Sequence, residues 1–92
     1  MRVVWTHAAA NDLEQISDYL FEQHAEIAVD TIRRIYQTAA ALKQFPHRGR
    51  PGRKQGTREL VLIQLPYLVV YEIVGQRVHI LRVLHGARRW PE

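Results

Sequence analysis

Two amphipathic helices are predicted in the first half of the chain. The first begins after Thr6, whose hydroxyl can cap it, and runs to about Gln23. The second runs from about Glu26 to Phe45, and Pro46 ends it. Apolar residues recur at steps of three and four in both segments: Ala9, Leu13, Ile16 and Leu20 in the first, and Ala28, Ile32, Ile35, Ala39 and Leu42 in the second. The two stripes predict an antiparallel helical hairpin.

Strand-like segments stand before and after these helices. Met1–Trp5 is a short run of this kind. Three longer runs, rich in Val, Ile, Leu and Tyr, are predicted as strands at Thr57–Leu65, Tyr67–Val74 and Arg77–Leu84. A chain of 92 residues can bury one hydrophobic core but not two. We therefore expect a single domain, residues 1–92, of the α+β class: a short N-terminal strand, an antiparallel helical hairpin and a three-stranded antiparallel meander.

The two-residue turn at Gly75 and Gln76 predicts the register of the last two strands. Counting outward from it pairs Ile73 with Val78, Glu72 with His79, Tyr71 with Ile80, Val70 with Leu81, Val69 with Arg82 and Leu68 with Val83. One sheet face then carries Tyr67, Val69, Tyr71, Ile73, Val78 and Ile80, and the other carries Leu68, Val70, Leu81 and Val83. Because one face packs on the helical hairpin, the second apolar face is expected to need another cover. This is a first indication of a protein partner.

Positive charge is concentrated in the second half of the chain. Residues 1–45 carry four Lys and Arg against six Asp and Glu, whereas residues 46–92 carry nine against three. This polarity favours an anionic partner, either nucleic acid or an acidic protein, and the alternative is a role in solubility alone. The absence of cysteine excludes disulfides and thiolate chemistry. With no signal-peptide pattern and no apolar run near the roughly 18 residues that span a membrane, we expect a cytoplasmic protein without a membrane partner.

Much of the positive charge lies in His47–Gly56, HRGRPGRKQG, where Gly and Pro predict an irregular loop. Four cations there could contact nucleic acid phosphates or an acidic protein groove: Arg48, Arg50, Arg53 and Lys54. A solvated loop is the alternative. Arg58, at the start of the next strand, either contacts a target or fixes the loop by pairing with Glu59 or a helix acid. Arg82 lies among apolar neighbours in mid-strand, so we expect a structural ion pair with Asp12 or Asp18.

Residues that carry chemistry are sparse. His85 is the best acid or base candidate, because an unperturbed imidazole titrates near neutral pH, although a histidine at a strand end is more often structural. The other four histidines lack the spacing of metal ligands: His7, His24, His47 and His79. We expect no metal and no cofactor.

Four segments, in this order, resemble the RelE/ParE toxins of bacterial type II toxin–antitoxin modules: FPHRGRPG, GTREL, YLVVYEI and VHILRVLHGARRWP. The opening WTHAAANDLEQISDYL is similar to the first helix of that family, so the resemblance covers nearly the whole chain. It implies a compact α+β toxin that a small antitoxin neutralises by wrapping it with a C-terminal segment, in a toxin–antitoxin hetero-oligomer. It leaves the target open, since some members cut messenger RNA on the ribosome whereas ParE-type members poison DNA gyrase.

Metal-independent RNA cleavage needs a general acid, a general base and cations on the reacting phosphate. The resemblance implies that nuclease members set Lys or Arg on the central strands, but the matching positions here are Glu59, Val61 and Leu68. Arg88 keeps the expected charge, and the tail carries Trp90 where a nuclease often has Tyr. We therefore favour a ParE-like inhibitor of DNA gyrase that acts by binding rather than by catalysis.

Two other functions stay open. One is a ribosome-dependent, metal-independent messenger RNA endoribonuclease that uses His85 and Arg88. The other is a degenerate family member that binds its antitoxin and nothing else.

Two contact surfaces follow from the favoured function. The expected gyrase contacts are Arg48, Arg50, Arg53, Lys54, Arg58, Arg88, Arg89 and Trp90. An aromatic tail that folds back onto the core is the alternative for Trp90. The antitoxin is expected to lay an apolar segment along the helical hairpin or over the second sheet face. The residues expected on that face are Leu68, Val70, Leu81 and Val83.

Overall fold

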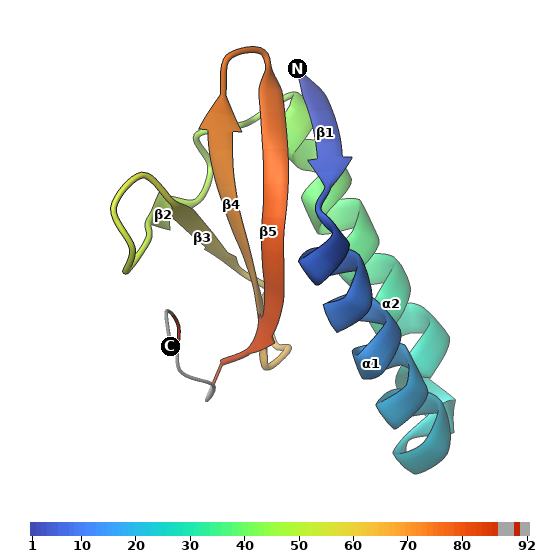
Figure 1. The fold of residues 1–92 in the computed structure, drawn as a ribbon. Helices are drawn as coiled ribbons and strands as arrows, with labels where there is room; N and C mark the ends of the chain where they lie inside the picture. The colour runs from blue at the N-terminus through green and yellow to red at the C-terminus, as the bar shows by residue number, and fades with distance from the viewer. Residues whose placement is uncertain (87–89, 91–92) are drawn as a thin grey trace.

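The computed structural model describes residues 1–86 and residue 90, and within them five strands form one sheet with a helical hairpin packed on one face (Figure 1). The elements are β1 Arg2–Trp5, α1 His7–Gln23, α2 Ala25–Ala40, the 3-10 turn η1 Ala41–Lys43, β2 Arg50–Pro51, β3 Arg58–Val61, β4 Tyr67–Val74 and β5 Arg77–His85. This order confirms the predicted α+β class. Within the described part of the chain, no helix is long and apolar enough to cross a membrane.

The helices begin and end for local reasons. Thr6 is the N-cap of α1, as predicted: its hydroxyl accepts a hydrogen bond from the Ala9 amide (3.2 Å). The same hydroxyl donates to the Ile80 carbonyl (2.7 Å), which ties the start of the helix to β5. The predicted end of the second helix at Phe45 is wrong, because α2 stops at Ala40 and tightens into η1. Proline disfavours the α conformation at the residue that precedes it. The last turn therefore tightens and ends ahead of Pro46.

The predicted meander of β3, β4 and β5 is present and is extended on both sides. β1 lies parallel to β5, and β2 pairs antiparallel with β3, which gives the order β1-β5-β4-β3-β2. The prediction of an irregular loop throughout His47–Gly56 is therefore wrong. Pro51 is tolerated in β2 because the strand lies at the sheet edge, where its missing N–H needs no partner. The third strand ends at Val61 instead of Leu65, because the chain turns through Gln64, which has a positive φ of 62°.

A β-bulge changes the predicted register of the last two strands. The predicted partners Ile73 and Val78 are confirmed, as are the pairs up to Tyr71. Beyond it the pairing shifts by one residue, so Val70 lies opposite Arg82 instead of the predicted leucine. The shift turns Val83 toward the helices, which corrects its placement on the second sheet face.

Apolar side chains of the described residues gather on both faces of the sheet. The buried cluster on the helix side contains Ala9, Ile35, Ala39, Leu42, Leu62, Tyr67, Val69, Tyr71, Val78, Ile80 and Val83. The second sheet face, which points away from the helices, is formed by Leu68, Val70 and Leu84, with Leu81 and Trp90 packed against them. Leu68 is 4% exposed and Val70 is fully buried. The expectation that this face needs a partner as cover is therefore wrong, because Trp90 folds back onto it.

Candidate functional site

A buried carboxylate fastens the basic loop, residues 47–56, to the sheet. Glu59 lies on β3 with 2% of its surface exposed. Its carboxylate accepts hydrogen bonds from the backbone amide (2.9 Å) and Nε (3.3 Å) of Arg53 and from the guanidinium of Arg50 (3.4 Å). Burial by itself raises the pKa of Glu59, but the hydrogen bonds and charge of Arg53, helped by Arg50, hold it below its ordinary value of 4.5. The carboxylate is ionised at neutral pH and orients both arginines.

The backbone of the basic loop is held by Tyr71 and Arg58. The Gly49 amide donates to the Tyr71 hydroxyl (2.9 Å), which in turn donates to the Pro46 carbonyl (2.7 Å). A Cβ at Gly49 would lie 2.8 Å from the Tyr71 ring, so a larger residue does not fit. Arg58 donates to the carbonyls of Gly49 (2.8 Å) and His47 (3.3 Å). Arg58 therefore has a structural role, although backbone carbonyls replace the predicted carboxylate partner.

The structure brings the loop cations and Trp90 to the same side of the sheet. Cross-strand partners point to one face, and Arg50, Glu59 and Val70 are partners across β2, β3 and β4. Val70 belongs to the second sheet face, against which Trp90 packs. Arg50 and Arg53, which both contact Glu59, therefore lie at the edge of that face. All four cations of the basic loop are exposed: Arg48, Arg50, Arg53 and Lys54. The loop part of the predicted contact surface is therefore available for binding.

The tail part of that predicted surface has a different outcome. Trp90 lies on the second sheet face, and its indole nitrogen is buried and has no hydrogen-bond partner among the residues that the structure describes. This is the fold-back that the sequence left as an alternative to target contact. Arg88 and Arg89 lie outside the described residues.

A bidentate ion pair joins α1 to β5. Arg82 donates from Nε (2.7 Å) and Nη2 (2.9 Å) to the carboxylate of Asp12, which also accepts the Val83 amide (3.0 Å). The predicted pairing of Arg82 with an acid of the first helix is thus confirmed, and the acid is Asp12. Asp12 is 6% exposed. The Val83 amide that it accepts lies past Ile80, the last residue of β5 that pairs with β1, so the carboxylate replaces a strand partner there. The pair is structural.

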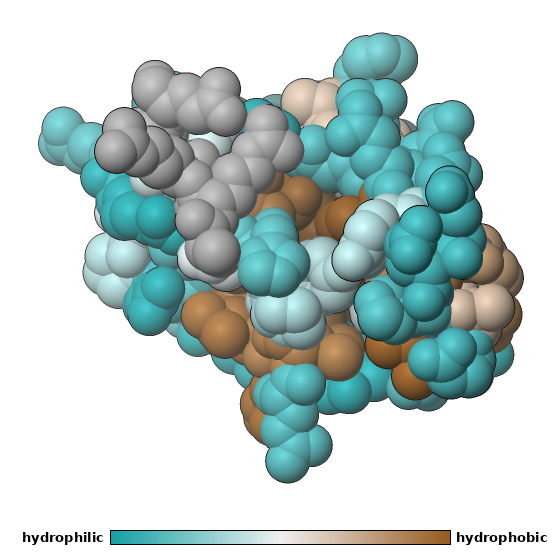
Figure 2. All heavy atoms as spheres, turned by 90° about the horizontal axis from the view of Figure 1, so that it is seen from below, coloured by the Kyte–Doolittle hydropathy of each residue, from teal (hydrophilic) through white to brown (hydrophobic). Residues whose placement is uncertain are grey.

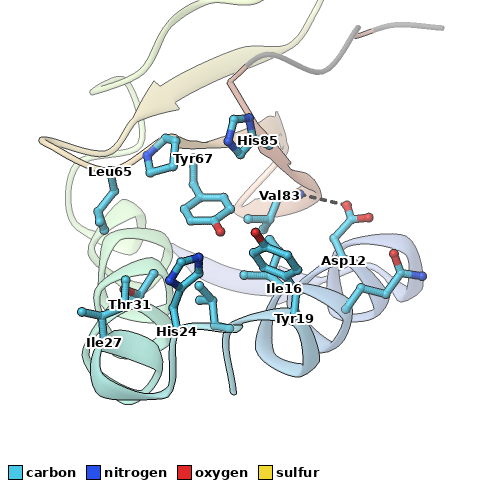
Figure 3. A pocket seen from close by; sticks show the side chains of 13 residues that line it. Asp12, Ile16, Tyr19, His24, Ile27, Thr31, Leu65, Tyr67, Val83 and His85 are labelled. Carbon is cyan, nitrogen blue, oxygen red and sulfur yellow. Dashed lines mark hydrogen bonds between the residues drawn. The ribbon is translucent and has the colours of Figure 1, made fainter. Parts of the chain in front are cut away.

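A cleft opens at the end of the molecule where the helical hairpin extends past the sheet. Figure 2 views this end and shows hydrophobic surface interrupted by hydrophilic side chains. The cleft, here called the open-end cleft, has a volume of about 490 Å³. It is lined by Asp12, Gln15, Ile16, Tyr19, Leu20, His24, Ile27, Thr31, Leu65, Pro66, Tyr67, Val83 and His85. In Figure 3 the rings of Tyr19, His24 and Tyr67 lie around one space between the helices and the sheet.

The open-end cleft is apolar with ring groups at its margin. Tyr67 and His85 meet edge to face with ring centroids 5.8 Å apart, and Tyr19 and His24 do so at 5.9 Å. Burial, helped by Tyr19, raises the pKa of Tyr67 above its ordinary 10.0, so its phenol stays protonated at neutral pH and is no general base. His85 lines the cleft, but its predicted companion Arg88 lies outside the described residues. Among residues 1–86 and 90, no group of three or more potential ligands could hold a metal ion.

The apolar stripes did not predict the open-end cleft. Tyr19 and Ile27 lie outside those stripes and are 54% and 45% exposed. Phe21 and Val29 are 51% and 54% exposed, so the segment 19–29, which contains the turn of the hairpin, exposes four large apolar side chains. Such a group at a helix–helix turn is the sequence signal that could have indicated a partner site.

Three comparisons identify the family. A model described as ParE toxin of type II toxin-antitoxin system, parDE, matches residues 3–90. "Putative toxin Y4kP" of Sinorhizobium fredii is 38% identical over 91 residues, which cover 99% of this chain and 94% of that protein. "Toxin RelE2" of Caulobacter vibrioides is 37% identical over 87 residues, covering 95% and 97%.

A solved structure agrees with these matches. The chain described as "Chromosomal ParDE TA system from P. aeruginosa" has a TM-score of 0.85 at 30% identity and covers 92% of this chain and 95% of its own. Family model, relatives and structure all extend over nearly the whole chain. The protein therefore belongs to the ParE toxin family and is the toxin of a type II toxin–antitoxin module, in which it pairs with a cognate antitoxin.

Proposed function

We propose that this toxin inhibits DNA gyrase by binding to it and stalls it on cleaved DNA, without catalysing a reaction itself. The proposal rests on the residues found at the sheet positions where nuclease relatives are expected to have cations. Glu59 is an anion engaged by the basic loop, and Leu68 is 4% exposed within the second sheet face. The negatively charged phosphate of an RNA backbone at these positions would meet a carboxylate and apolar side chains, which cannot replace its hydration. This favours docking over RNA cleavage.

The basic loop supplies a docking surface. Its backbone is held by Tyr71 and Arg58, and its arginines Arg50 and Arg53 are oriented by Glu59. Side chains that are ordered before binding lose less conformational freedom when a partner arrives. The loop is therefore our proposed contact surface for the complex of gyrase with its DNA.

A gyrase supercoiling assay beside a translation assay tests the proposal. We expect purified toxin to stop supercoiling and to accumulate cleaved DNA, while messenger RNA in the translation reaction stays intact. Relaxation of the same plasmid by topoisomerase I is the control, because simple coating of the DNA would slow that enzyme too. Normal supercoiling with codon-specific messenger RNA cleavage would establish the nuclease instead. Neither activity, in a toxin that still binds its antitoxin, would indicate the degenerate module.

We further propose that the antitoxin lays its apolar segment along the helical hairpin and into the open-end cleft. The second sheet face, the other surface considered, offers little, since Leu68 and Val70 are buried and Val83 lies on the helix side. The hairpin instead exposes Tyr19 and Ile27, which line the cleft, and also exposes Phe21 and Val29, which are not among the lining residues. Covering such large apolar side chains contributes on the order of 1.5–3 kcal/mol each.

Ile27→Asp is expected to weaken antitoxin binding by about tenfold to a hundredfold, because the loss of one buried apolar side chain corresponds to roughly that change in Kd. The substitution should not harm the fold, since Ile27 is 45% exposed in the first turn of α2, where a carboxylate interacts favourably with the helix dipole. Titration calorimetry with the antitoxin measures the effect. Val74→Asp is the matched control, because Val74 is 46% exposed at the far end of β4. Equal affinity of the Ile27 variant and the wild type would exclude this surface.

A further inference from the structure

We propose that the basic loop binds the phosphodiester backbone of duplex DNA, so that the toxin contacts DNA directly as well as its protein target. This deepens the proposed function, because DNA engaged by gyrase is the duplex that the loop would meet. The proposal rests on the arrangement and charge of the loop residues, and DNA binding can be measured in the absence of gyrase.

Glu59 holds Arg50 and Arg53 as a pair of outward-facing cations. Arg50 uses Nη2 (3.4 Å) and Arg53 uses Nε (3.3 Å) on the two oxygens of one carboxylate. The carboxylate side chain is 1% exposed, whereas the two arginine side chains are 61% and 45% exposed. A guanidinium has five N–H donors, so each arginine keeps donors for a phosphate oxygen. The anion is thus hidden behind the two cations that it orients.

The net charge of the whole chain is located in this segment. Of 13 Lys and Arg and 9 Asp and Glu in the chain, five cations and one anion lie in residues 47–61. The remaining eight cations are therefore balanced by eight anions. A phosphate backbone would be attracted to one edge of the sheet rather than to the molecule in general.

Hydrogen bonds within the loop hold its backbone. Its turn is closed by hydrogen bonds from the Gly52 amide to the Thr57 carbonyl (2.7 Å) and from the Thr57 hydroxyl to the Lys54 carbonyl (2.5 Å). A Cβ at Gly52 would collide with the Thr57 hydroxyl, so the turn cannot accept a larger residue. The cations are therefore presented on a fixed frame.

The composition of the loop favours duplex DNA over a protein or a single strand. Between Arg48 and Gly56 there is no aromatic or large apolar residue. Protein interfaces depend on such anchors, and single strands are bound by stacking their bases on aromatic rings. Contacts to the backbone of a duplex need only cations and other hydrogen-bond donors.

Fluorescence anisotropy with a labelled duplex of about 20 base pairs, without gyrase, tests the proposal between about 50 and 200 mM salt. We expect a slope of log K against log salt of about −3.5, the value for roughly four phosphate contacts. Arg50→Ala with Arg53→Ala should reduce the slope to about −2 and the affinity at low salt by about tenfold. Arg2→Ala with Arg77→Ala removes equal charge from the opposite edge of the sheet and should change the affinity less than about twofold. Equal losses in the two double variants would overturn the proposal.

Glu59→Gln separates positioning from charge. The substitution raises the net charge, so general attraction would strengthen DNA binding. If the carboxylate positions Arg50 and Arg53, binding should instead weaken severalfold in a variant whose circular dichroism is unchanged. Tighter binding by this variant would overturn the proposal.

Other ligands supply the remaining comparisons. A single-stranded RNA of equal length and polyglutamate should both bind more weakly than the duplex, and tighter binding of either would refute the assignment to duplex DNA. Duplex binding by a toxin that leaves supercoiling untouched would remove the proposed gyrase function and retain this inference. Gyrase inhibition without duplex binding would support the proposed gyrase function and overturn this inference.

Discussion

Asp12→Ala is expected to destabilise the toxin by about 3–5 kcal/mol, because it removes the carboxylate of a largely buried ion pair. The Asp12 carboxylate accepts two hydrogen bonds from Arg82 and one from the Val83 amide, and alanine replaces none of them. A domain of this length is stable by only about 5–15 kcal/mol, so the loss is a large share of the total. The variant should lose its toxicity through unfolding rather than through any change in its contact surfaces.

Thermal unfolding followed by circular dichroism measures this effect. Each kcal/mol corresponds to about 4–8 °C in Tm for a domain of this size. Asp18→Ala is the matched control, since Asp18 is exposed on the same helix and should change Tm by only a few degrees. Asp12→Asn retains an oxygen acceptor for the Val83 amide and should fall between the two. An Asp12→Ala variant that melts with the Asp18 control would show that the ion pair contributes little.

Glu59→Gln is expected to cost about 1.5–3 kcal/mol at neutral pH, the usual range for hydrogen bonds to a charged group. The pKa of Glu59 is lowered in the folded protein, mainly by Arg53 against the opposing effect of burial. A lowered pKa means that the carboxylate stabilises the fold above the ordinary value of 4.5 and loses this contribution as the pH falls through the folded value. The gap between wild type and variant should therefore shrink in acid.

Denaturant unfolding at neutral pH and at a pH well below that ordinary value checks the sign. Wild type should lose more stability on acidification than Glu59→Gln does, because the variant has no carboxylate to protonate at this position. Glu14→Gln, on the exposed side of α1, serves as the control and should show the same small difference at both pH values. A gap between wild type and Glu59→Gln that is equal at both pH values would contradict the assigned role of the carboxylate.

Local pattern and local chemistry accounted for most of the elements. The Thr6 cap, the end of α1 at Gln23 and the turn between β4 and β5 depend on residues near one another in the chain, and all were predicted correctly. The loop cations Arg50 and Arg53 were also named from the sequence, because glycine, proline and arginine in close succession indicate an exposed basic segment.

The errors fall where distant residues decide the outcome. The bulge near Tyr71 reversed the face of Val83, and counting from a turn cannot detect an extra residue in a strand. For Trp90 the sequence left target contact and a fold-back onto the core both open, and the structure shows its ring packed beside Leu68 and Val70. The open-end cleft was missed because its walls come from four elements that meet only after folding.

The sequence by itself determined the fold class, the family resemblance and the place of the positive charge, since periodicity, turn residues and charge are properties of neighbouring positions. The tertiary structure alone decided what that charge can do. Glu59 turns an ordinary basic loop into an ordered pair of arginines, and Asp12 binds Arg82 across 70 positions of the chain. Burial and hydrogen bonding set both arrangements, and they depend on which residues meet in space rather than on which are adjacent in sequence.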